Sequence, residues 1–366
     1  MRILFIISML GSGGAQRQMV TISKLLKSRG YEPEVLYYKN RNPFYLNELN
    51  ENHIPVHYIE ANNVVTRALK IRQFVRSNSF DTVISFLDMP DFYNVFSALG
   101  PRTWKVITSE RSADEARFNS KFGQLLSWIK KFSDKIVCNS DNARKMWLKH
   151  YPLLEDKLTT IYNTVKIPSV TTDYVSLSEN KLHIVVAASY KDVKNPLNVI
   201  HALSRLSTED KERIQINWYG DKEVLQGDDL VYKQSVSLIE SYKLENQIRL
   251  NGQTKDISNI MNQADVVGLF SKFEGLPNAI CEAMTLGKPI VMSRISDYDI
   301  LVDKSNGVLC DWENVESIAD AFRLLLRKGQ ENLSEMGKSS KLKSKHLFSE
   351  DVVLQNWITL FERIER

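Results

Sequence analysis

Short runs of apolar residues alternate along the chain with stretches in which apolar residues recur at helical spacing. The short runs, bounded by polar residues or glycine, are typical of buried strands, and the longer stretches are typical of helices packed on a sheet. The predicted strands are residues 3–8, 34–38, 56–59, 82–86, 105–109, 135–139 and 159–162, then 182–188, 215–219, 248–251, 266–270, 289–293 and 307–310. The predicted helices include 15–29, 66–77, 196–206, 232–242, 257–263, 277–286 and 315–326. This alternation predicts βαβ units and parallel sheets.

The alternation is interrupted at residues 167–173, which have the composition of a linker, and then restarts. A chain of 366 residues is long enough for two hydrophobic cores, since a domain has roughly 150 residues. We therefore predict an α/β protein with two Rossmann-like, doubly wound domains, residues 1–170 and 171–348, and a cleft between them. Residues 349–366 are predicted to end the chain as an amphipathic helix.

Composition narrows the class of protein. An apolar content of 43% and a charged content of 25% are ordinary for a soluble globular protein. The apolar run at residues 1–10 is short and leads into a Gly-rich turn, so it predicts a buried strand rather than a signal peptide. The three cysteines are far apart and the histidines show no metal-ligand spacing. These features favour a cytoplasmic location and argue against disulfides or a bound metal.

Charge is distributed unevenly between the two predicted domains. Residues 1–170 carry 24 basic and 15 acidic residues, a net charge of +9, whereas residues 171–366 carry 24 and 29, a net charge of −5. A basic half suggests a polyanionic partner such as a phosphate-bearing ligand, an anionic membrane surface or nucleic acid. Nucleic acid is disfavoured because no recognised binding module is present. Chance asymmetry is the alternative.

The most informative segment begins where the predicted strand 266–270 ends (FSKFEGLPN, residues 270–278). Pro277 is well placed as the first helical residue, and the new helix directs its positive dipole end to the sheet edge where open α/β folds bind ligands. Such a site suits a diphosphate. Glu274 and Glu282 can accept hydrogen bonds from hydroxyls at different points of a sugar-rich ligand. Taken alone, Glu274 is equally well explained as a partner of the helix dipole, and Glu282 as a surface residue of the helix.

A second loop follows the predicted strand 182–188 (ASYKDVKNP, residues 188–196). Lys194 is placed to meet a diphosphate there. A cation at this position stabilises a departing nucleoside diphosphate more in the transition state than in the ground state. A solvated loop lysine is the alternative.

Two loops of the first domain carry further candidates. Residues 8–18 (SMLGSGGAQRQ) form a strand, a Gly-rich turn and a helix start, but Gln16 stands where a dinucleotide fingerprint needs glycine, so NAD binding is disfavoured. Gly13 and Gly14 are the predicted ligand-facing positions, with a tight packing turn as the alternative. Residues 109–112 (SERS) follow another strand, which places Glu110 to orient an acceptor hydroxyl and Arg111 to meet phosphate.

Residues 117–132 (RFNSKFGQLLSWIKKF) combine aromatic and basic residues at helical spacing. The apolar stripe consists of Phe118, Phe122, Leu125, Ile129 and Phe132, and it is flanked by Lys121, Lys130 and Lys131. Such a helix can lie on an anionic membrane, and a stripe that faces the core is equally compatible with the pattern.

Residues 264–291 (ADVVGLFSKFEGLPNAICEAMTLGKPIV) closely resemble the donor-site signature of retaining glycosyltransferases with the GT-B fold, of the group-1, family-4 type. The resemblance covers most of the chain. It includes the Gly-rich first turn, the Lys-Asn-Pro sequence of residues 194–196 and the terminal helix, which in that family crosses back to the first domain. It implies an acceptor-binding domain and a nucleotide-sugar domain facing each other across a cleft, and a reaction without metal or cofactor.

The resemblance also implies roles for single residues. Glu274 would hold hydroxyls of the transferred sugar, Glu282 would take the ribose hydroxyls, and Arg17 would lie on the acceptor side with Glu110 and Arg111. The backbone that would line the sugar and diphosphate belongs to Gly275, Leu276, Pro277 and Asn278. The rest of the implied donor site is made of Lys194, Gly13, Gly14, Ser189 and Lys191. The residues assigned to catalysis are Glu274, Lys194 and Glu110. Weaker matches to family loop positions are Asn139–Ser140, Asn163–Thr164 and Gly220–Asp221.

This sequence departs from the family at one position that bears on chemistry. The family usually has an arginine five residues before Lys194, and Ser189 stands there instead. Lys191 and an arginine from elsewhere in the chain are the two candidates to replace that charge. No general base is identifiable, which fits the family's same-face mechanism, in which the departing phosphate oxygen takes the acceptor's proton.

The resemblance implies retaining transfer of a hexose or N-acetylhexosamine from a UDP-sugar to a saccharide, lipid-linked acceptor in surface polysaccharide synthesis. The expected location is the cytoplasm, with possible peripheral contact at the inner face of the plasma membrane. Two alternatives stay open: a sugar-nucleotide epimerase of the same architecture, and an inactive sugar-nucleotide-binding protein. The segment from Glu274 to Glu282 argues against the epimerase. The missing arginine at Ser189 is the only support for the inactive binding protein.

Overall fold

The computed structural model describes residues 1–165, 181–223 and 228–365, and the chain divides into two compact units. Unit 1 comprises residues 1–164 together with 350–366, and unit 2 comprises residues 165–349. The predicted linker at 167–173 lies outside the described residues. Within the described part of the chain, no helix is long and apolar enough to cross a membrane.

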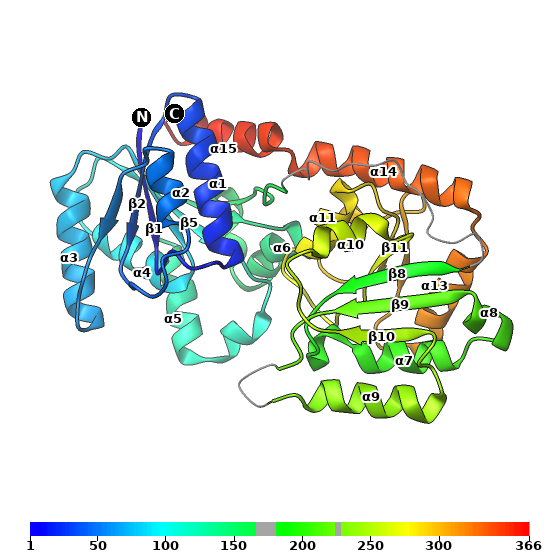
Figure 1. Ribbon diagram of the computed structural model, residues 1–366. Helices are drawn as coiled ribbons and strands as arrows, with labels where there is room; N and C mark the ends of the chain where they lie inside the picture. Colours follow the sequence, from blue (N-terminus) through cyan, green and yellow to red (C-terminus); the bar gives the residue numbers. More distant parts are fainter. Residues whose placement is uncertain (166–180, 224–227, 366) are drawn as a thin grey trace. The chain divides into compact units, whose positions relative to one another are not determined.

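Unit 1 is built on a seven-stranded sheet in the order β3-β2-β1-β4-β5-β6-β7, with parallel pairing throughout (Figure 1). In its register, Leu4 of β1 pairs with Glu34 on one side and Val83 on the other. The strands are β1 (Arg2–Ile7), β2 (Glu32–Tyr37), β3 (Val56–Tyr58), β4 (Thr82–Phe86), β5 (Lys105–Glu110), β6 (Lys135–Cys138) and β7 (Leu158–Thr160).

Helices cover both faces of this sheet, because successive residues of a strand point to opposite sides. Phe5 and Ile7 belong to one buried cluster, and Leu4 and Ile6 belong to another. The helices are α1 (Gly14–Ser28), α2 (Leu46–Glu51), α3 (Val64–Ser77), α4 (Asp88–Ser97), α5 (Lys121–Lys130), α6 (Asp141–His150) and α15 (Glu350–Glu365), with 3₁₀ turns η1 (Glu115–Asn119) and η2 (Pro152–Lys157).

The terminal helix α15 completes the core of unit 1, although it follows unit 2 in the sequence. Trp357 is 1% exposed and shares a buried cluster with Phe5 and Met19. Phe361 lies 6.0 Å from the Trp357 ring and 5.9 Å from Tyr31, measured between ring centroids. The amphipathic pattern of this helix therefore serves packing against β1 and α1.

Unit 2 repeats the architecture on a six-stranded parallel sheet in the order β10-β9-β8-β11-β12-β13. Its strands are β8 (Leu182–Ala187), β9 (Ile214–Tyr219), β10 (Ile248–Asn251), β11 (Val266–Leu269), β12 (Ile290–Ser293) and β13 (Gly307–Cys310). Its helices are α7 (Pro196–Ser204), α8 (Thr208–Glu212), α9 (Leu230–Tyr242), α10 (Ile257–Gln263), α11 (Asn278–Thr285), α12 (Tyr298–Leu301), α13 (Val315–Leu326) and α14 (Gln330–Phe348), with the 3₁₀ turn η3 (Asp192–Lys194).

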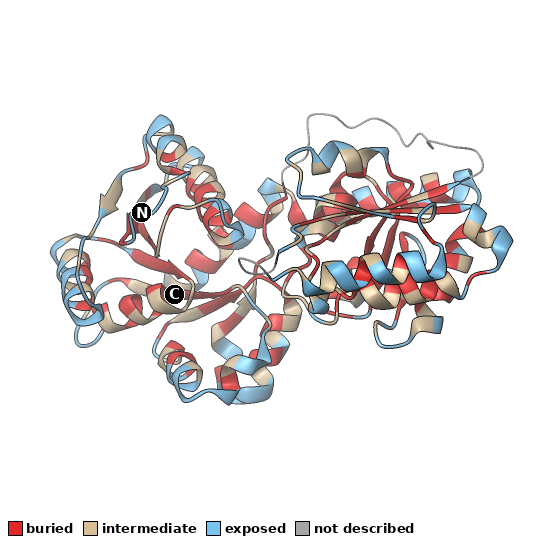
Figure 2. Cartoon of the chain, turned by 60° about the horizontal axis from the view of Figure 1, so that its bottom comes forward, coloured by how far each residue is buried: buried red, intermediate tan, exposed pale blue. Residues whose placement is uncertain are grey.

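The predicted strands and helices are all present, with ends within two residues of the predicted bounds. Figure 2 shows why: the strands are buried along most of their length and so read as short apolar runs, whereas the helices are buried on one side only and so carry a helical periodicity. Helix α14 was not predicted, because its buried side includes Gly337, Ser340 and Ser344 instead of a continuous apolar stripe. A Cβ at Gly337 would overlap the Gly287 carbonyl, so a small residue is required there.

Replacing Trp357 with alanine should destabilise unit 1 by about 3–5 kcal/mol, because it leaves a cavity between α15 and the sheet. Hydrogen exchange should show faster exchange in β1 and β2 and wild-type protection in β8 and β9. The exposed neighbour Glu362 provides the control, and Glu362→Ala should change neither set. Equal effects of the two substitutions would contradict this account of α15.

Candidate active site

The residues predicted to bind the donor lie at the point of unit 2 where the strand order reverses. β8 and β11 are adjacent in the sheet, with Ile184 paired to Val266, but the chain leaves them toward opposite flanks. In open parallel sheets, ligands bind outside the carboxyl ends of two such strands. The loops that follow β8 and β11 contain Lys194 and Glu274, so the fold brings the two predicted residues to one place.

The loop after β8 is shaped by Asn195. This residue has φ 63° and ψ 39°, in the left-handed region that asparagine tolerates better than most residues. Its side-chain amide donates to the Trp312 carbonyl at 2.9 Å, which fixes the turn. Helix α7 begins immediately afterwards at Pro196. The turn sets the direction of Lys194, the last residue of η3.

Among the described residues, three interactions join the loop after β8 to the loop after β11, and a fourth lies within the loop after β11. The Lys272 amide donates to the Val193 carbonyl at 2.8 Å, and the Lys272 ammonium pairs with Asp192 at 2.6 Å. Lys194 forms an ion pair with Glu274, and the Ser271 hydroxyl donates to the same carboxylate oxygen at 2.8 Å. The predicted site residues thus contact each other directly, and Ser271, Lys272 and Asp192 support them.

The Lys194–Glu274 pair is accessible enough to exchange partners. The two side chains are 22% and 17% exposed, so each charge still meets solvent. A phosphate group that approached Lys194 would compete with Glu274, and the released carboxylate would be able to accept hydrogen bonds from hydroxyls. The arrangement can therefore hold an anionic group and a polyhydroxylated group side by side.

Helix α11 starts one residue later than predicted. Pro277 is the N-cap and not the first helical residue, because its ψ of 82° is outside the helical region. The amides of Ile280 and Cys281 donate to the Pro277 carbonyl at 3.0 and 3.1 Å, and no side chain caps this helix end. The Ser296 hydroxyl donates to the Gly275 carbonyl, and this hydrogen bond anchors the loop between β11 and α11. The positive helix end still lies at the carboxyl edge of the sheet.

The remaining donor-side predictions lie around this core. Ser189 and Lys191 are half-buried in the loop after β8, where the Lys191 amide donates to the Ser189 carbonyl at 2.9 Å. Glu282 is half-buried in α11. Gly220 has a packing role, since a Cβ there would overlap the Ala188 carbonyl. Sequence reasoning did not assign Lys272, Asp192 and Ser271, although all three lie inside the two predicted loops.

In unit 1, the Gly-rich turn leads from β1 into α1. Gly13 is the N-cap with ordinary extended backbone, and Gly14 is the first helical residue. A Cβ at Gly14 would meet no atom within 4 Å, and one at Gly13 would meet only the flexible Gln16 side chain. Neither the backbone conformation nor the nearest neighbours among the described residues require glycine at these two positions. Arg17 is exposed one turn further on.

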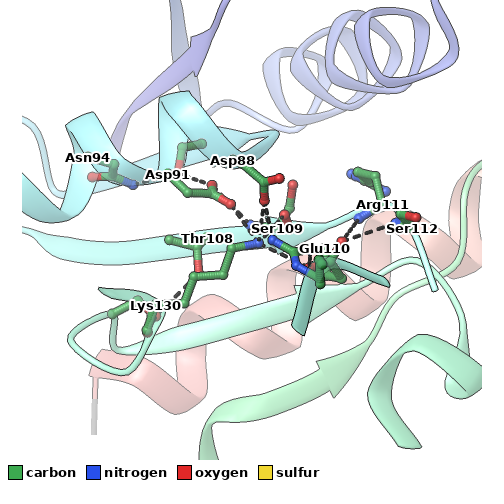
Figure 3. A network of polar contacts seen from close by, with 12 residues as sticks. Asp88, Asp91, Asn94, Thr108, Ser109, Glu110, Arg111, Ser112 and Lys130 are labelled. Atoms are coloured by element: carbon green, nitrogen blue, oxygen red, sulfur yellow. Dashed lines mark hydrogen bonds and ion pairs between the residues drawn. The ribbon is translucent and has the colours of Figure 1, made fainter. Parts of the chain in front are cut away.

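Glu110 lies in a buried network of charges, and it does not face solvent (Figure 3). Its side chain is 3% exposed and pairs with Arg117 and, at 3.2 Å, with Lys130. Trp147 donates its indole N–H to the same carboxylate at 3.0 Å. The amides of Arg111 and Ser112 donate to the other oxygen, both at 3.1 Å. Its contacts hold the loop that follows β5, which is a positioning role rather than contact with an acceptor.

Lys130 is the centre of this network. Its ammonium group, 1% exposed, lies 2.9 Å from Asp91 and 3.6 Å from Asp88. Lys130 was predicted to flank a stripe that faces either a membrane or the core, and its burial opposite three carboxylates places it inside the unit. Asp91 also accepts from the Ser85 hydroxyl at 2.6 Å. The network joins α4, β5 and α5; of these helices, α4 was not predicted.

Burial and pairing act against each other on the pKa values of this network. Burial raises the pKa of Asp91 to about 7, although Lys130 opposes the shift. Burial also disfavours the charge on Lys130, but Asp91 and Glu110 outweigh it and raise its pKa. Burial lowers the pKa of Arg111 to about 10, despite the opposing effect of Asp91. Arg111 donates to the Asn163 amide oxygen at 2.9 Å and lies 4.3 Å above the Phe86 ring.

Two Rossmann-like units, each built on a parallel sheet with loops at its carboxyl edge, define the GT-B class of glycosyltransferase folds. The family model "Glycosyl transferases group 1" matches residues 173–343, and "Glycosyltransferase Family 4" matches residues 12–167. Together they cover almost the whole chain. The protein belongs to the group-1 glycosyltransferases with the GT-B fold, as its sequence predicted.

Relatives of known activity and a solved structure agree with this assignment. The chain is 24% identical over 383 residues to the Campylobacter jejuni GalNAc-alpha-(1->4)-GalNAc-alpha-(1->3)-diNAcBac-PP-undecaprenol alpha-1,4-N-acetyl-D-galactosaminyltransferase, covering 100% of this chain and 99% of that one. It is 25% identical over 215 residues to the Escherichia coli UDP-Gal:alpha-D-GlcNAc-diphosphoundecaprenol alpha-1,3-galactosyltransferase, covering 53% of each. The structure of Anabaena HepE in complex with UDP matches with a TM-score of 0.83 at 17% identity, covering 99% of this chain and 100% of that one.

Replacing Lys130 with methionine should destabilise the protein by about 3–5 kcal/mol, because it leaves buried carboxylates without their cation. Asp91 already binds a proton more tightly when folded than when unfolded, and loss of Lys130 raises its folded pKa above about 7. The part of the stability loss that Asp91 causes in the variant is therefore present above pH 7, and it shrinks as the pH falls toward 5.

Urea titrations at pH 8 and pH 5 test this prediction. The exposed Lys121, also on α5, provides the matched control, and Lys121→Met should stay within about 0.5 kcal/mol of wild type at both values. A Lys130→Met deficit that is the same at pH 5 as at pH 8 would contradict the role given to Asp91.

Proposed function

We propose that this protein is a retaining transferase that moves a hexose or N-acetylhexosamine from a UDP-sugar to a lipid-linked saccharide acceptor in the cytoplasm. The Lys194–Glu274 pair at the strand-order reversal of unit 2 is the observation that carries the proposal. A cation and a carboxylate in contact match a substrate in which a diphosphate adjoins a sugar. The UDP bound to the structural relative HepE and the undecaprenol-linked acceptors named for two relatives support the donor and acceptor classes.

In this reaction, the bond between the anomeric carbon and the UDP phosphate oxygen breaks, and a bond from that carbon to the acceptor oxygen forms on the same face. Lys194 stabilises the charge that develops on the departing diphosphate, together with the N-terminus of α11. Glu274 holds hydroxyls of the transferred sugar and Glu282 those of the ribose. The acceptor's proton passes to the departing phosphate oxygen, so no protein base is required.

Unit 1 supplies the acceptor side in this proposal. Gly13 and Gly14 allow the substrate to approach the backbone at the start of α1. Arg17 and Arg111 offer cations to a phosphate-bearing acceptor, and Glu110 acts by holding the loop that carries Arg111. Lys191 stays our candidate for the charge that the family places at the position of Ser189, and Lys272 in the opposite loop is a second one.

Replacing Glu274 with alanine should lower kcat/KM for transfer by roughly 100-fold or more, the usual effect of losing a transition-state contact. UDP itself should bind at least as well as before, because Glu274 competes with the diphosphate for Lys194. Lys194→Ala should reduce both transfer and UDP binding. Thermal stabilisation by UDP reports the binding, since a ligand that binds only the folded state raises its stability.

The control is Glu209→Gln, which changes an exposed carboxylate of α8 outside the two site loops and should keep transfer near wild type. Wild-type turnover by both site variants would refute the assignment. Conversion of the UDP-sugar to an epimer without any acceptor would favour the epimerase, and donor binding with neither transfer nor hydrolysis would favour an inactive binding protein. An inverted anomer in the product would refute retention.

A further inference from the structure

Helix α5, labelled in Figure 1, and the residues that follow it expose a group of large apolar side chains. Phe122, Leu125, Trp128 and Phe132 are 63%, 51%, 46% and 45% exposed. At roughly 100° per residue, Phe122, Leu125 and Trp128 fall within one side of the helix, and Phe132 follows directly after its C-cap, Lys131. Side chains of this size are rarely left uncovered in such a group. The exposed group is called the α5 face below.

The opposite side of α5 has the residues that hold it in unit 1. Leu126, Ser127 and Lys130 are buried, and Lys130 pairs with Asp91. Phe118, which precedes the helix, packs at 5.7 Å against Trp147 and is also buried. The predicted apolar stripe is therefore divided: Phe118 and Ile129 pack against the core, whereas Phe122, Leu125 and Phe132 are exposed.

Lysines lie at both ends of the α5 face. Lys121 is exposed at the start of the helix, and the Lys131 ammonium lies 3.9 Å from the centre of the Trp128 ring. Lys157 donates to the carbonyls of Lys131 and Ser133 at the end of the helix. Residues 116–133 contain no aspartate or glutamate. The acidic residues that flank this stretch are Glu115 and Asp134. Glu115 pairs with Lys149, and Asp134 pairs with Arg102.

We propose that the α5 face docks on the surface of an anionic phospholipid bilayer. Aromatic side chains favour the boundary between head groups and acyl chains, and the lysines at both ends can reach the lipid phosphates. A second copy of the chain is a poorer partner, because pairing two such faces would bring lysines of like charge together. Docking itself does not depend on the proposed function. Only its purpose rests on that function: it would hold the enzyme where a lipid-linked acceptor is found.

Vesicle co-sedimentation tests the proposal with the full-length protein. Wild type should bind vesicles of phosphatidylglycerol and phosphatidylcholine and should bind pure phosphatidylcholine much less. The double variant Phe122→Glu, Trp128→Glu should bind the anionic vesicles at least about tenfold more weakly. Lys121→Gln, Lys131→Gln should lose the preference for anionic lipid. The matched control is Leu324→Glu, at an equally exposed leucine of α13 in unit 2, which should bind like wild type.

Circular dichroism and thermal stabilisation by UDP verify that the variants are folded. Transfer to a water-soluble acceptor analogue should be unchanged in the Phe122, Trp128 variant, whereas transfer to an acceptor embedded in vesicles should fall. Vesicle binding without any transfer would refute the proposed function and leave the docking surface standing. Wild-type vesicle binding by the variant would overturn the docking surface, as would a wild-type dimer that the same substitutions dissociate.

Discussion

Parallel strand pairing is the constraint on which the rest of this structure depends. Because every strand within a unit runs in the same direction, the loops that follow the strands emerge at one edge of each sheet. Residues as far apart in sequence as Lys194 and Glu274 can therefore form an ion pair. The same constraint brings the loops after β1 and β5 to one edge of unit 1. No other feature of the chain would gather these segments.

The two units stabilise their edge loops by different physical means. In unit 2, partly exposed ion pairs and one backbone hydrogen bond join the loops after β8 and β11. Exposed pairs are worth little and exchange readily, which suits a site that must admit a charged ligand. In unit 1, Lys130, Asp91 and Glu110 are buried together, where a missing partner is costly. That network fixes a loop and is poorly suited to exchange partners with a substrate.

Helix α5 links the buried network to the surface. Its inner side provides the cation that holds Asp91 and Glu110, and its outer side exposes the apolar residues of the α5 face. Residues so close in sequence have opposite environments because a helix turns by about 100° per residue. The helix can thus be fixed to the core by charge and still present apolar groups to a partner.

The sequence alone predicted the strands, the doubly wound class of both units and the two loops of the donor site. These depend on local periodicity and on where a strand ends, and both can be read from a few adjacent residues. It did not reveal α14, whose packing side depends on small residues. It also placed Glu110 toward a ligand and left open whether Lys130 lies beside a membrane-facing or a core-facing stripe, since nothing local distinguishes a buried charge from an exposed one.

Only the tertiary structure decided those two positions. A charged side chain is buried when partners from other elements compensate its lost hydration, and Asp91, Arg117 and Trp147 come from separate parts of the chain. The same reason explains why Lys272 and Asp192 were not assigned, since each acquires its role from a loop 80 residues away. Local patterns determined the elements and the edge at which the chemistry lies, and long-range contacts determined which side chains are available to perform it.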